Sequence, residues 1–247
     1  MQNKYVGDIG DFGKYAMLRY LTQTGLSLGV NWYLTPDENQ SGDGRLTAYL
    51  DNRQMEDYDK ELFLVLHNLV KGQQRDVREV ESSGILPQDT AYHTQLLDWS
   101  LVAAGESRST YRDAWHQAAL AAMQNSNLVF LDPDNGLQVK SASLTSRKGN
   151  KYIGFHELQD YIRLGKSVVF YNHRERKQED AYLNKFRKLR ENEAAFHHTE
   201  IFGIKFSGGT VRDYIFLLQP KHRLAVIDRC HSLLNSRWRS HFSQLAL

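Results

Sequence analysis

Two carboxylates and a side-chain amide follow directly on a run of apolar residues in the middle of the chain. The run at 127–131 reads as a buried strand, and Asp132, Pro133, Asp134 and Asn135 come after it. Ligands of open α/β sheets bind at the carboxyl ends of the strands. Two carboxylates and an amide on such a loop therefore lie where the chemistry of such a protein usually takes place. An Asx-rich turn is the alternative interpretation.

Three glycines at a spacing of three residues precede the first helical pattern. They are Gly7, Gly10 and Gly13, and Lys14 follows one turn inside the expected helix. Free N–H groups at a helix start favour anions, and a lysine there would pair with a carboxylate or a phosphate. The spacing is not that of the dinucleotide-binding or P-loop fingerprints. The alternative is a flexible loop capped by Asp11.

Acidic residues and glycines also follow the apolar run at 28–34. Thr35, Asp37 and Glu38 come first, and the turn-forming stretch 39–45 reads Asn-Gln-Ser-Gly-Asp-Gly-Arg. A ribose diol or an amino group would find hydrogen-bond acceptors here. A polar surface loop explains the same residues.

A basic segment begins with Arg174, Arg176 and Lys177. Residues 174–190 contain seven basic and three acidic side chains, a net charge of +4, interleaved with aromatic residues. This composition suits contacts with nucleic-acid phosphates. A solvated helix face of mixed charge is the alternative.

The composition bounds these possibilities. The 247 residues carry 31 Lys+Arg and 29 Asp+Glu, so a nucleic-acid binder defined by bulk charge is excluded, whereas a local basic groove is not. Cys230 is the single cysteine, which excludes an internal disulfide framework; we expect it in the core of the C-terminal helix.

The adjacent pair His197-His198, expected in a strand, makes a poor metal site because neighbouring strand residues face opposite ways, and we expect no metal motif. The start of the chain lacks a secretory pattern and no window is apolar enough for a membrane span, so we expect a cytoplasmic protein.

Apolar runs that alternate with helical patterns must position these residues. The spacing predicts helices over 11–25, 58–71, 110–124, 156–164, 176–192 and 221–235, and strands over 28–34, 127–131, 166–172, 196–206 and 212–218. Such alternation favours an α/β fold, a Rossmann-like three-layer sandwich with a mostly parallel sheet. The glycine turn at 207–210 predicts that the last two strands form an antiparallel hairpin. A mostly parallel sheet with one antiparallel strand at or near its end is the pattern of class I methyltransferases. Residues 1–247 would form one such domain, with 46–100 as a helical insertion.

The order of the motifs resembles the ribosomal-RNA adenine N6-methyltransferases of the RlmJ type. Residues 7–18 are similar to the family's Gly-Asn-x-x-Asp-x-x-Lys-His stretch, residues 128–135 look like its Asp-Pro-Pro-Tyr strand end, and 168–171 stand where it has the next strand. This chain has Asp134-Asn135 in place of Pro-Tyr, and residues 35–38 in place of the glycine-rich cofactor loop. The chain also resembles a group of uncharacterised bacterial proteins.

The resemblance implies transfer of a methyl group from S-adenosylmethionine to an amine of a nucleic acid, either RNA or DNA. Lys14 and the amides from Gly10 onward would take the methionine carboxylate, Asp37 the ribose or amino group, and Tyr5 would cover the base. Gly7 and Thr35 complete the cofactor-binding set that the resemblance implies. Asp132 and the Pro133 carbonyl would accept hydrogen bonds from the target amine, and Asp134 or Asn135 would hold a second polar edge of the substrate. A target base in a duplex would first be flipped out.

Two other functions fit the same residues. A metal-dependent nuclease or phosphodiesterase would place a divalent cation and a lysine beside a phosphate, using Asp132, Asp134, Glu157 and either Lys140 or Lys151. A catalytically degenerate methyltransferase fold would serve as a binding module for nucleic acid or for a partner protein. The sequence does not indicate an oligomeric state.

Overall fold

A computed structural model describes residues 1–38 and 44–247, so most of the turn-forming stretch 39–45 lies outside the described residues. The helices are α1 (Ile9–Thr22), α2 (Lys60–Lys71), α3 (Val77–Ser82), α4 (Arg108–Ala122), α5 (Phe155–Arg163), α6 (Glu179–Arg187), α7 (Leu189–Asn192) and α8 (Arg223–Leu234). The strands are β1 (Leu28–Asn31), β2 (Ala91–His93), β3 (Leu128–Leu131), β4 (Gly136–Leu137), β5 (Tyr152–Ile153), β6 (Ser167–Asn172), β7 (Glu200–Ser207), β8 (Val211–Leu218) and β9 (Phe242–Gln244).

The central sheet has the strand order β2-β1-β3-β6-β8-β7-β9. Strands β2, β1, β3 and β6 run parallel, whereas β8 pairs antiparallel with both β6 and β7. The α/β class, the mostly parallel sheet and the C-terminal hairpin are therefore confirmed. The second strand of the hairpin, β8, is the one that contacts the parallel strands.

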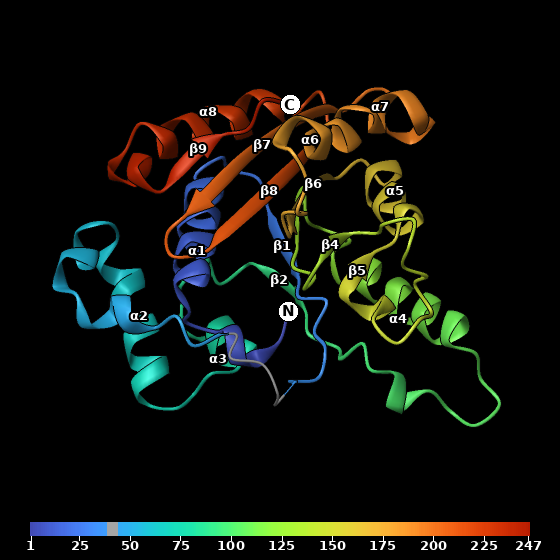
Figure 1. Cartoon of the computed structure of the whole chain (residues 1–247), viewed down its shortest axis with the longest axis horizontal. Coiled ribbons are helices and arrows are strands. Elements are labelled where there is room, and N and C mark those ends of the chain that lie inside the picture. The colour runs from blue at the N-terminus through green and yellow to red at the C-terminus, as the bar shows by residue number, and fades with distance from the viewer. Residues whose placement is uncertain (39–43) are drawn as a thin grey trace.

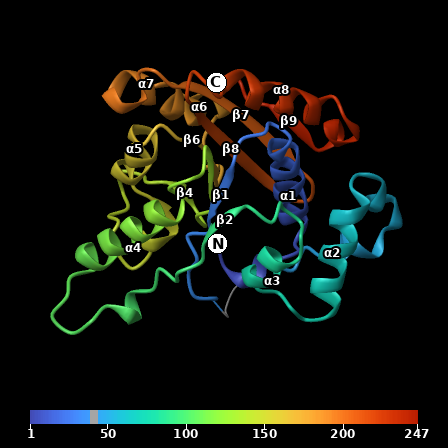
Figure 2. The same cartoon turned by 180° about the vertical axis from the view of Figure 1, so that it is seen from behind.

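Two separate helical layers cover the two faces of the central sheet (Figures 1 and 2). Leu128 and Phe130 of β3 join a core cluster with α1, α2 and α8, while Val129 and Leu131 join a second cluster with α4, α5 and α6. This two-residue alternation is the period of a strand buried on both faces. It confirms the predicted three-layer sandwich.

Several predicted boundaries are wrong. The segment 46–100 is not purely helical, because β2 lies within it and pairs with β1 at an edge of the central sheet. The helix predicted over 176–192 starts at Glu179 and is interrupted at Lys188, and the strand predicted over 196–206 starts at Glu200. His197-His198 consequently lie in a turn before β7.

The remaining sequence-based expectations concern burial. Cys230 lies in the core within α8, as predicted, and burial raises the pKa of its thiol. Over the two described ranges, no helix combines the length and apolar character that a membrane crossing requires.

Candidate functional site

The carboxyl ends of the parallel strands meet the start of β8 at one edge of the sheet. Asn31 of β1 is in register with Leu131 of β3, and Asn172 of β6 with Asp213 of β8. Because β8 is antiparallel, its first residues lie where the other strands end. The edge therefore gathers the segments that follow β1, β3 and β6, together with Arg212.

A cavity of about 440 Å³ opens at this edge and is called the acidic cavity below. Four carboxylates line it, against the cations Lys151 and Arg212; the acids are Asp8, Glu38, Asp132 and Asp134. Two tyrosines, Tyr5 and Tyr171, also line it. Among the predicted site residues, the structure thus brings together Tyr5, Asp132, Pro133, Asp134 and Asn135.

Asp134 is the most heavily paired of these carboxylates. It accepts from Gln2 Nε2 at 2.6 Å, and lies 3.0 Å from the Met1 α-amino nitrogen and 3.5 Å from Lys151 Nζ. Burial raises the pKa of Asp134, but these groups outweigh burial, so its pKa lies below the ordinary value. The carboxylate is ionised at neutral pH.

Lys14 lies beneath the cavity rather than in its lining. Its Nζ is 2.8 Å from Asp11 Oδ1 and 2.8 Å from Asp132 Oδ2, and the residue is fully buried. Burial lowers the pKa of Lys14, but the two carboxylates outweigh burial and leave the pKa above its ordinary value. Lys14 pairs with carboxylates of this chain, so the predicted contact with a ligand carboxylate does not fit.

The start of α1 is also engaged within the protein. The helix begins at Ile9, earlier than predicted, and Asp8 rather than Asp11 caps it, accepting from Asp11 N at 2.8 Å. Arg212 Nη2 lies 2.9 and 2.8 Å from the two oxygens of Asp8. A Cβ on Gly10 would lie 2.0 Å from Arg212 Nε, so the glycine makes room for this guanidinium.

The other predicted cofactor residues lie outside the lining. Gly7 has a φ of +78°, and a Cβ there would lie 2.4 Å from Val70. Thr35 is buried, and its N–H donates to the Met1 carbonyl at 2.9 Å. Asp37 is exposed and accepts from Lys4 N at 3.2 Å.

Backbone hydrogen bonds hold the loop after β3 in place, and they leave the side chain of Asn135 available to a ligand. Asn135 N–H donates to the Lys151 carbonyl at 2.9 Å, and the Asn135 carbonyl accepts from His173 N at 3.2 Å. Gly136, at φ +96°, packs so closely on Asn172 that a Cβ would lie 2.2 Å from Oδ1. The side-chain amide of Asn135 has no hydrogen-bond partner within residues 1–38 and 44–247.

A larger cavity of about 890 Å³ adjoins the first, and Asn135 and His173 line both. It is called the lysine-rimmed groove below. Its apolar wall comprises Leu137, Val139, Tyr152, Phe155 and Leu189, and its rim carries Lys140, Lys177, Lys185 and Lys188. Lys177 and Lys185 both pair with Glu175, whereas Lys140 and Lys188 form no ion pair with any described residue.

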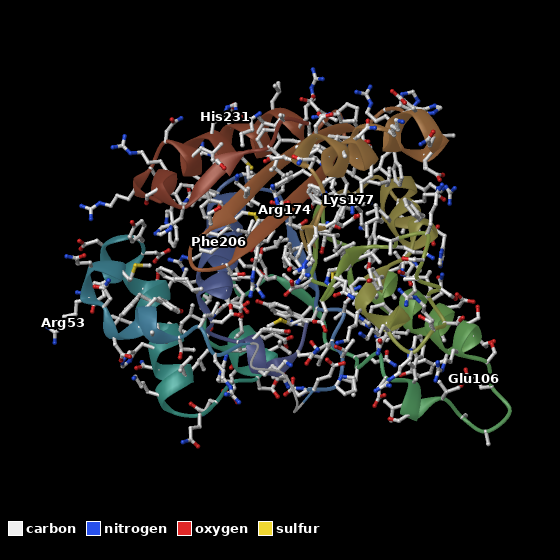
Figure 3. All side chains as sticks on the ribbon, in the orientation of Figure 1. Arg53, Glu106, Arg174, Lys177, Phe206 and His231 are labelled. Carbon is white, nitrogen blue, oxygen red and sulfur yellow. The ribbon has the colours of Figure 1, made fainter. Side chains whose placement is uncertain are left out.

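The three predicted nucleic-acid contacts differ in availability. Arg174 turns toward the protein, and its Nε and Nη2 lie 3.0 and 3.1 Å from the two oxygens of the fully buried Asp213. Arg176 is exposed. The side chain of Lys177 is 60% exposed and rims the groove, near Arg174 in Figure 3.

Glu157, which the nuclease hypothesis needs as a metal ligand, is fully buried and engaged elsewhere. It accepts from Arg112 at 2.6 and 2.9 Å, from Tyr33 OH at 3.2 Å and from Gly154 N at 2.6 Å. Burial raises the pKa of Glu157, but Arg112 outweighs it and the pKa lies below the ordinary value. Within the described ranges, no group of three His, Cys, Asp or Glu residues has the arrangement of a metal site.

His93, the last residue of β2, makes the stability of the protein depend on pH. It is 6% exposed, and burial lowers the pKa of its imidazole to about 4. The His93 imidazole binds a proton more readily in the unfolded chain than in the folded one. Its contribution to the free energy of unfolding is therefore full above about pH 6.5 and is lost as the pH falls toward 4. We expect the free energy of unfolding to fall by roughly 2–3 kcal/mol between pH 7 and about pH 4.5 through this group.

Urea denaturation of the wild type and of His93→Gln across this range measures that contribution. The variant is expected to lose less stability on acidification, and His197→Gln, an exposed histidine, should behave as the wild type. Identical pH profiles for the wild type and His93→Gln would contradict the assignment.

Sequence reasoning missed Arg212, Tyr171 and His173 as site residues. Arg212 was placed at the start of a strand that forms a hairpin with the preceding one, but which strand of the hairpin contacts the parallel strands was not predicted. Because β8 is that strand and runs antiparallel to β6, its first residues lie at the strand-end site. Tyr171 and His173 carry no comparable signal, since they surround the last residue of a strand that is buried along most of its length.

Comparison with known proteins adds no relationship to this geometry. No protein-family model matches the chain, and no curated protein matches its sequence.

Proposed function

We propose that the protein transfers a methyl group from S-adenosylmethionine to an amine nitrogen of a nucleic-acid base. The donor would lie in the acidic cavity and the base in the lysine-rimmed groove. One observation carries this proposal: the two cavities adjoin, and Asn135 and His173 line both. Ligands that fill them would meet beside the Asp-Pro-Asp-Asn loop, which is the arrangement that group transfer between two molecules requires.

The acidic cavity fits the donor in size and charge. Its volume of about 440 Å³ lies within the usual range for small-molecule sites. Four lining carboxylates suit the sulfonium and ammonium groups of S-adenosylmethionine. Because Arg212 and Lys151 are already paired with Asp8 and Glu38, the carboxylate of the donor would share Arg212 with Asp8. Glu38 and Gly44, on either side of residues 39–43, both line the cavity. When bound, the sulfonium supplies an activated methyl group.

The residues of this chain have a positioning role in that reaction. The Asn135 side-chain carbonyl would accept a hydrogen bond from the amine and direct the nitrogen lone pair toward the acidic cavity, and the proton that the amine loses on methylation would pass to water. Asp132, held by Lys14, provides a fixed negative charge in the lining. Holding two reactants in a reactive geometry contributes a large part of such catalysis.

The groove supports a nucleic-acid base as the acceptor. Tyr152 and Phe155 offer aromatic surfaces on which a base can stack, and Lys140 and Lys188 are available to phosphates. A base reaches such a groove only when it is unpaired or flipped out of a duplex. Single-stranded oligonucleotides are therefore the first substrates to test.

Binding and methyl transfer are measured separately to test the proposal. S-adenosylmethionine and S-adenosylhomocysteine should raise the melting temperature, and radiolabelled methyl groups should appear on single-stranded RNA or DNA. Asn135→Ala is expected to slow transfer by about 100-fold, typical for loss of one group that orients a reactant, with donor binding retained. Asn68→Ala, on the exposed face of α2, is the matched control and should transfer normally.

Three outcomes would redirect the assignment. Absence of any shift with either nucleoside at millimolar concentration would overturn methyl transfer. Oligonucleotide binding without donor binding would favour the binding module. A shift with Mg²⁺ or Mn²⁺ that Asp132→Ala and Asp134→Ala abolish would favour the nuclease.

A further inference from the structure

A third cavity, of about 390 Å³, lies at the opposite edge of the sheet, where β7 begins and β8 ends. It is called the arginine pocket below. Its basic lining comprises Arg187, Arg190, Arg223 and His198. β8 starts beside the acidic cavity and ends at the arginine pocket, so the length of this strand separates the two.

The charges in the arginine pocket are only partly compensated. Glu200 is the acidic residue of the lining, and it lies 3.4 Å from Arg223 Nη1. Arg190 donates to the His197 carbonyl at 3.4 Å and has no ion pair with a described residue. Donors of two guanidinium groups therefore remain for an anion.

Arg187 is held in place by contacts within the protein. Its Nη1 lies 2.7 Å from Asp180, and its Nε and Nη2 donate to the Ala246 carbonyl at 3.1 and 2.6 Å. Arg187 and Arg190 also line a smaller adjoining cavity of about 330 Å³, together with His197 and Glu191. Arginine side chains thus continue around α7, with one carboxylate among them.

Helices α6 and α7 form a ridge between the arginine pocket and the lysine-rimmed groove. Lys185 and Lys188, three residues apart, line the groove, whereas Arg187 and Arg190, with the same spacing, line the pocket. Each pair spans the interruption at Lys188, so the sides on which these residues lie follow from the two linings and not from helix periodicity. The ridge consequently presents cations on both of its sides.

We propose that the arginine pocket binds the phosphate backbone of the same nucleic-acid strand whose target base enters the groove. This inference rests on the proposed function and extends its substrate to a strand long enough to cross α6 and α7. Guanidinium groups match phosphate oxygens in geometry and charge. A helix is about 10–12 Å across, so the strand must extend over at least that distance between the groove and the pocket.

Contacts of this kind contribute affinity without reading sequence. The arginine pocket should therefore matter for long strands and not for short ones. Strands of about twenty nucleotides are expected to bind more tightly than strands of about six, with a steeper salt dependence.

Fluorescence anisotropy with these two lengths of single strand tests the inference. The double variant Arg190→Gln/Arg223→Gln is expected to weaken binding of the long strand by roughly tenfold and to reduce its salt slope by about 1.4, the value for two lost phosphate contacts. Binding of the short strand should be unchanged. The charge-conserving Arg190→Lys/Arg223→Lys should restore most of the loss.

The control Arg78→Gln/Arg237→Gln removes the same charge at exposed sites elsewhere. Equal losses with the control, or equal losses on both strand lengths, would overturn the inference. Unchanged binding of the long strand in the arginine double variant would also overturn it, because the groove alone would then hold the strand. If millimolar inorganic phosphate binds the wild type in a manner that the double variant abolishes, while long-strand affinity is unaffected, the pocket is a free-phosphate site instead. The methyltransferase proposal does not depend on any of these outcomes, because it is tested with the short strand.

Discussion

Replacing Lys14 by methionine is expected to lower the free energy of unfolding by about 3–5 kcal/mol, the typical cost of removing one partner from a buried ion pair. The ammonium lies between Asp11 and Asp132 with no exposure to water. Methionine keeps much of the volume but leaves two buried carboxylates without this cation. Urea denaturation followed by far-ultraviolet circular dichroism measures the change.

Two further variants show whether charge is the cause. Lys14→Met/Asp132→Asn removes one uncompensated carboxylate and should recover part of the lost stability. Lys71→Met breaks an exposed pair with Asp51 and should change stability far less, because solvent screens such pairs. A loss in Lys14→Met as small as that in Lys71→Met would mean that the buried cluster contributes little to stability.

Arg112→Met is expected to have an effect of similar size, again about 3–5 kcal/mol. Arg112 is 2% exposed, and in addition to its bonds with Glu157 it donates to the carbonyls of Gly149 at 2.9 Å and Tyr152 at 2.6 Å. The variant leaves Glu157 charged and buried, and frees the segment that carries Lys151. Urea denaturation gives the stability change, and hydrogen exchange across residues 144–152 reports the local loosening.

A second change separates charge from packing in this network. Arg112→Met/Glu157→Gln should be more stable than Arg112→Met, whereas Arg163→Gln, an exposed arginine paired with Asp160, should change stability by less than about 0.5 kcal/mol. Unaltered exchange over 144–152 in Arg112→Met would show that Arg112 does not hold this segment.

The parts of the fold that were predictable from sequence are those with long, uniform patterns. β3 is apolar throughout, β6 and β8 contain the apolar runs 168–171 and 214–218, and the glycine turn at 207–210 revealed the hairpin. β2 and β9 have three residues each, which is too few for an alternation, and β4 and β5 have two. Such short strands depend on pairing partners that are distant in sequence.

The candidate site was predictable to the same extent. The strand-end position of Asp132, Asp134 and Asn135 follows from an apolar run and its end. The environment of Lys14 does not, because Asp132 is 118 positions away and local spacing cannot show which carboxylate a lysine meets. The volume and linings of the adjoining cavities likewise depend on tertiary packing.

The contact between α1 and the last third of the chain bears on how the protein is made. Asp8 meets Arg212, 204 positions later, and the Phe12 ring packs 4.9 Å from that of Trp238; α1 and α8 lie side by side in Figure 1. At about 5–20 residues per second, the ribosome presents α1 roughly 10–40 s before Arg212 is synthesised. During that interval Phe12 can already meet Tyr49 and Phe63, whereas the part of α1 that packs against α8 lacks its partner on the nascent chain and is exposed to chaperones. The strand-end site thus forms only after Arg212 has been synthesised, so a ribosome that stalls before this residue leaves a product without it.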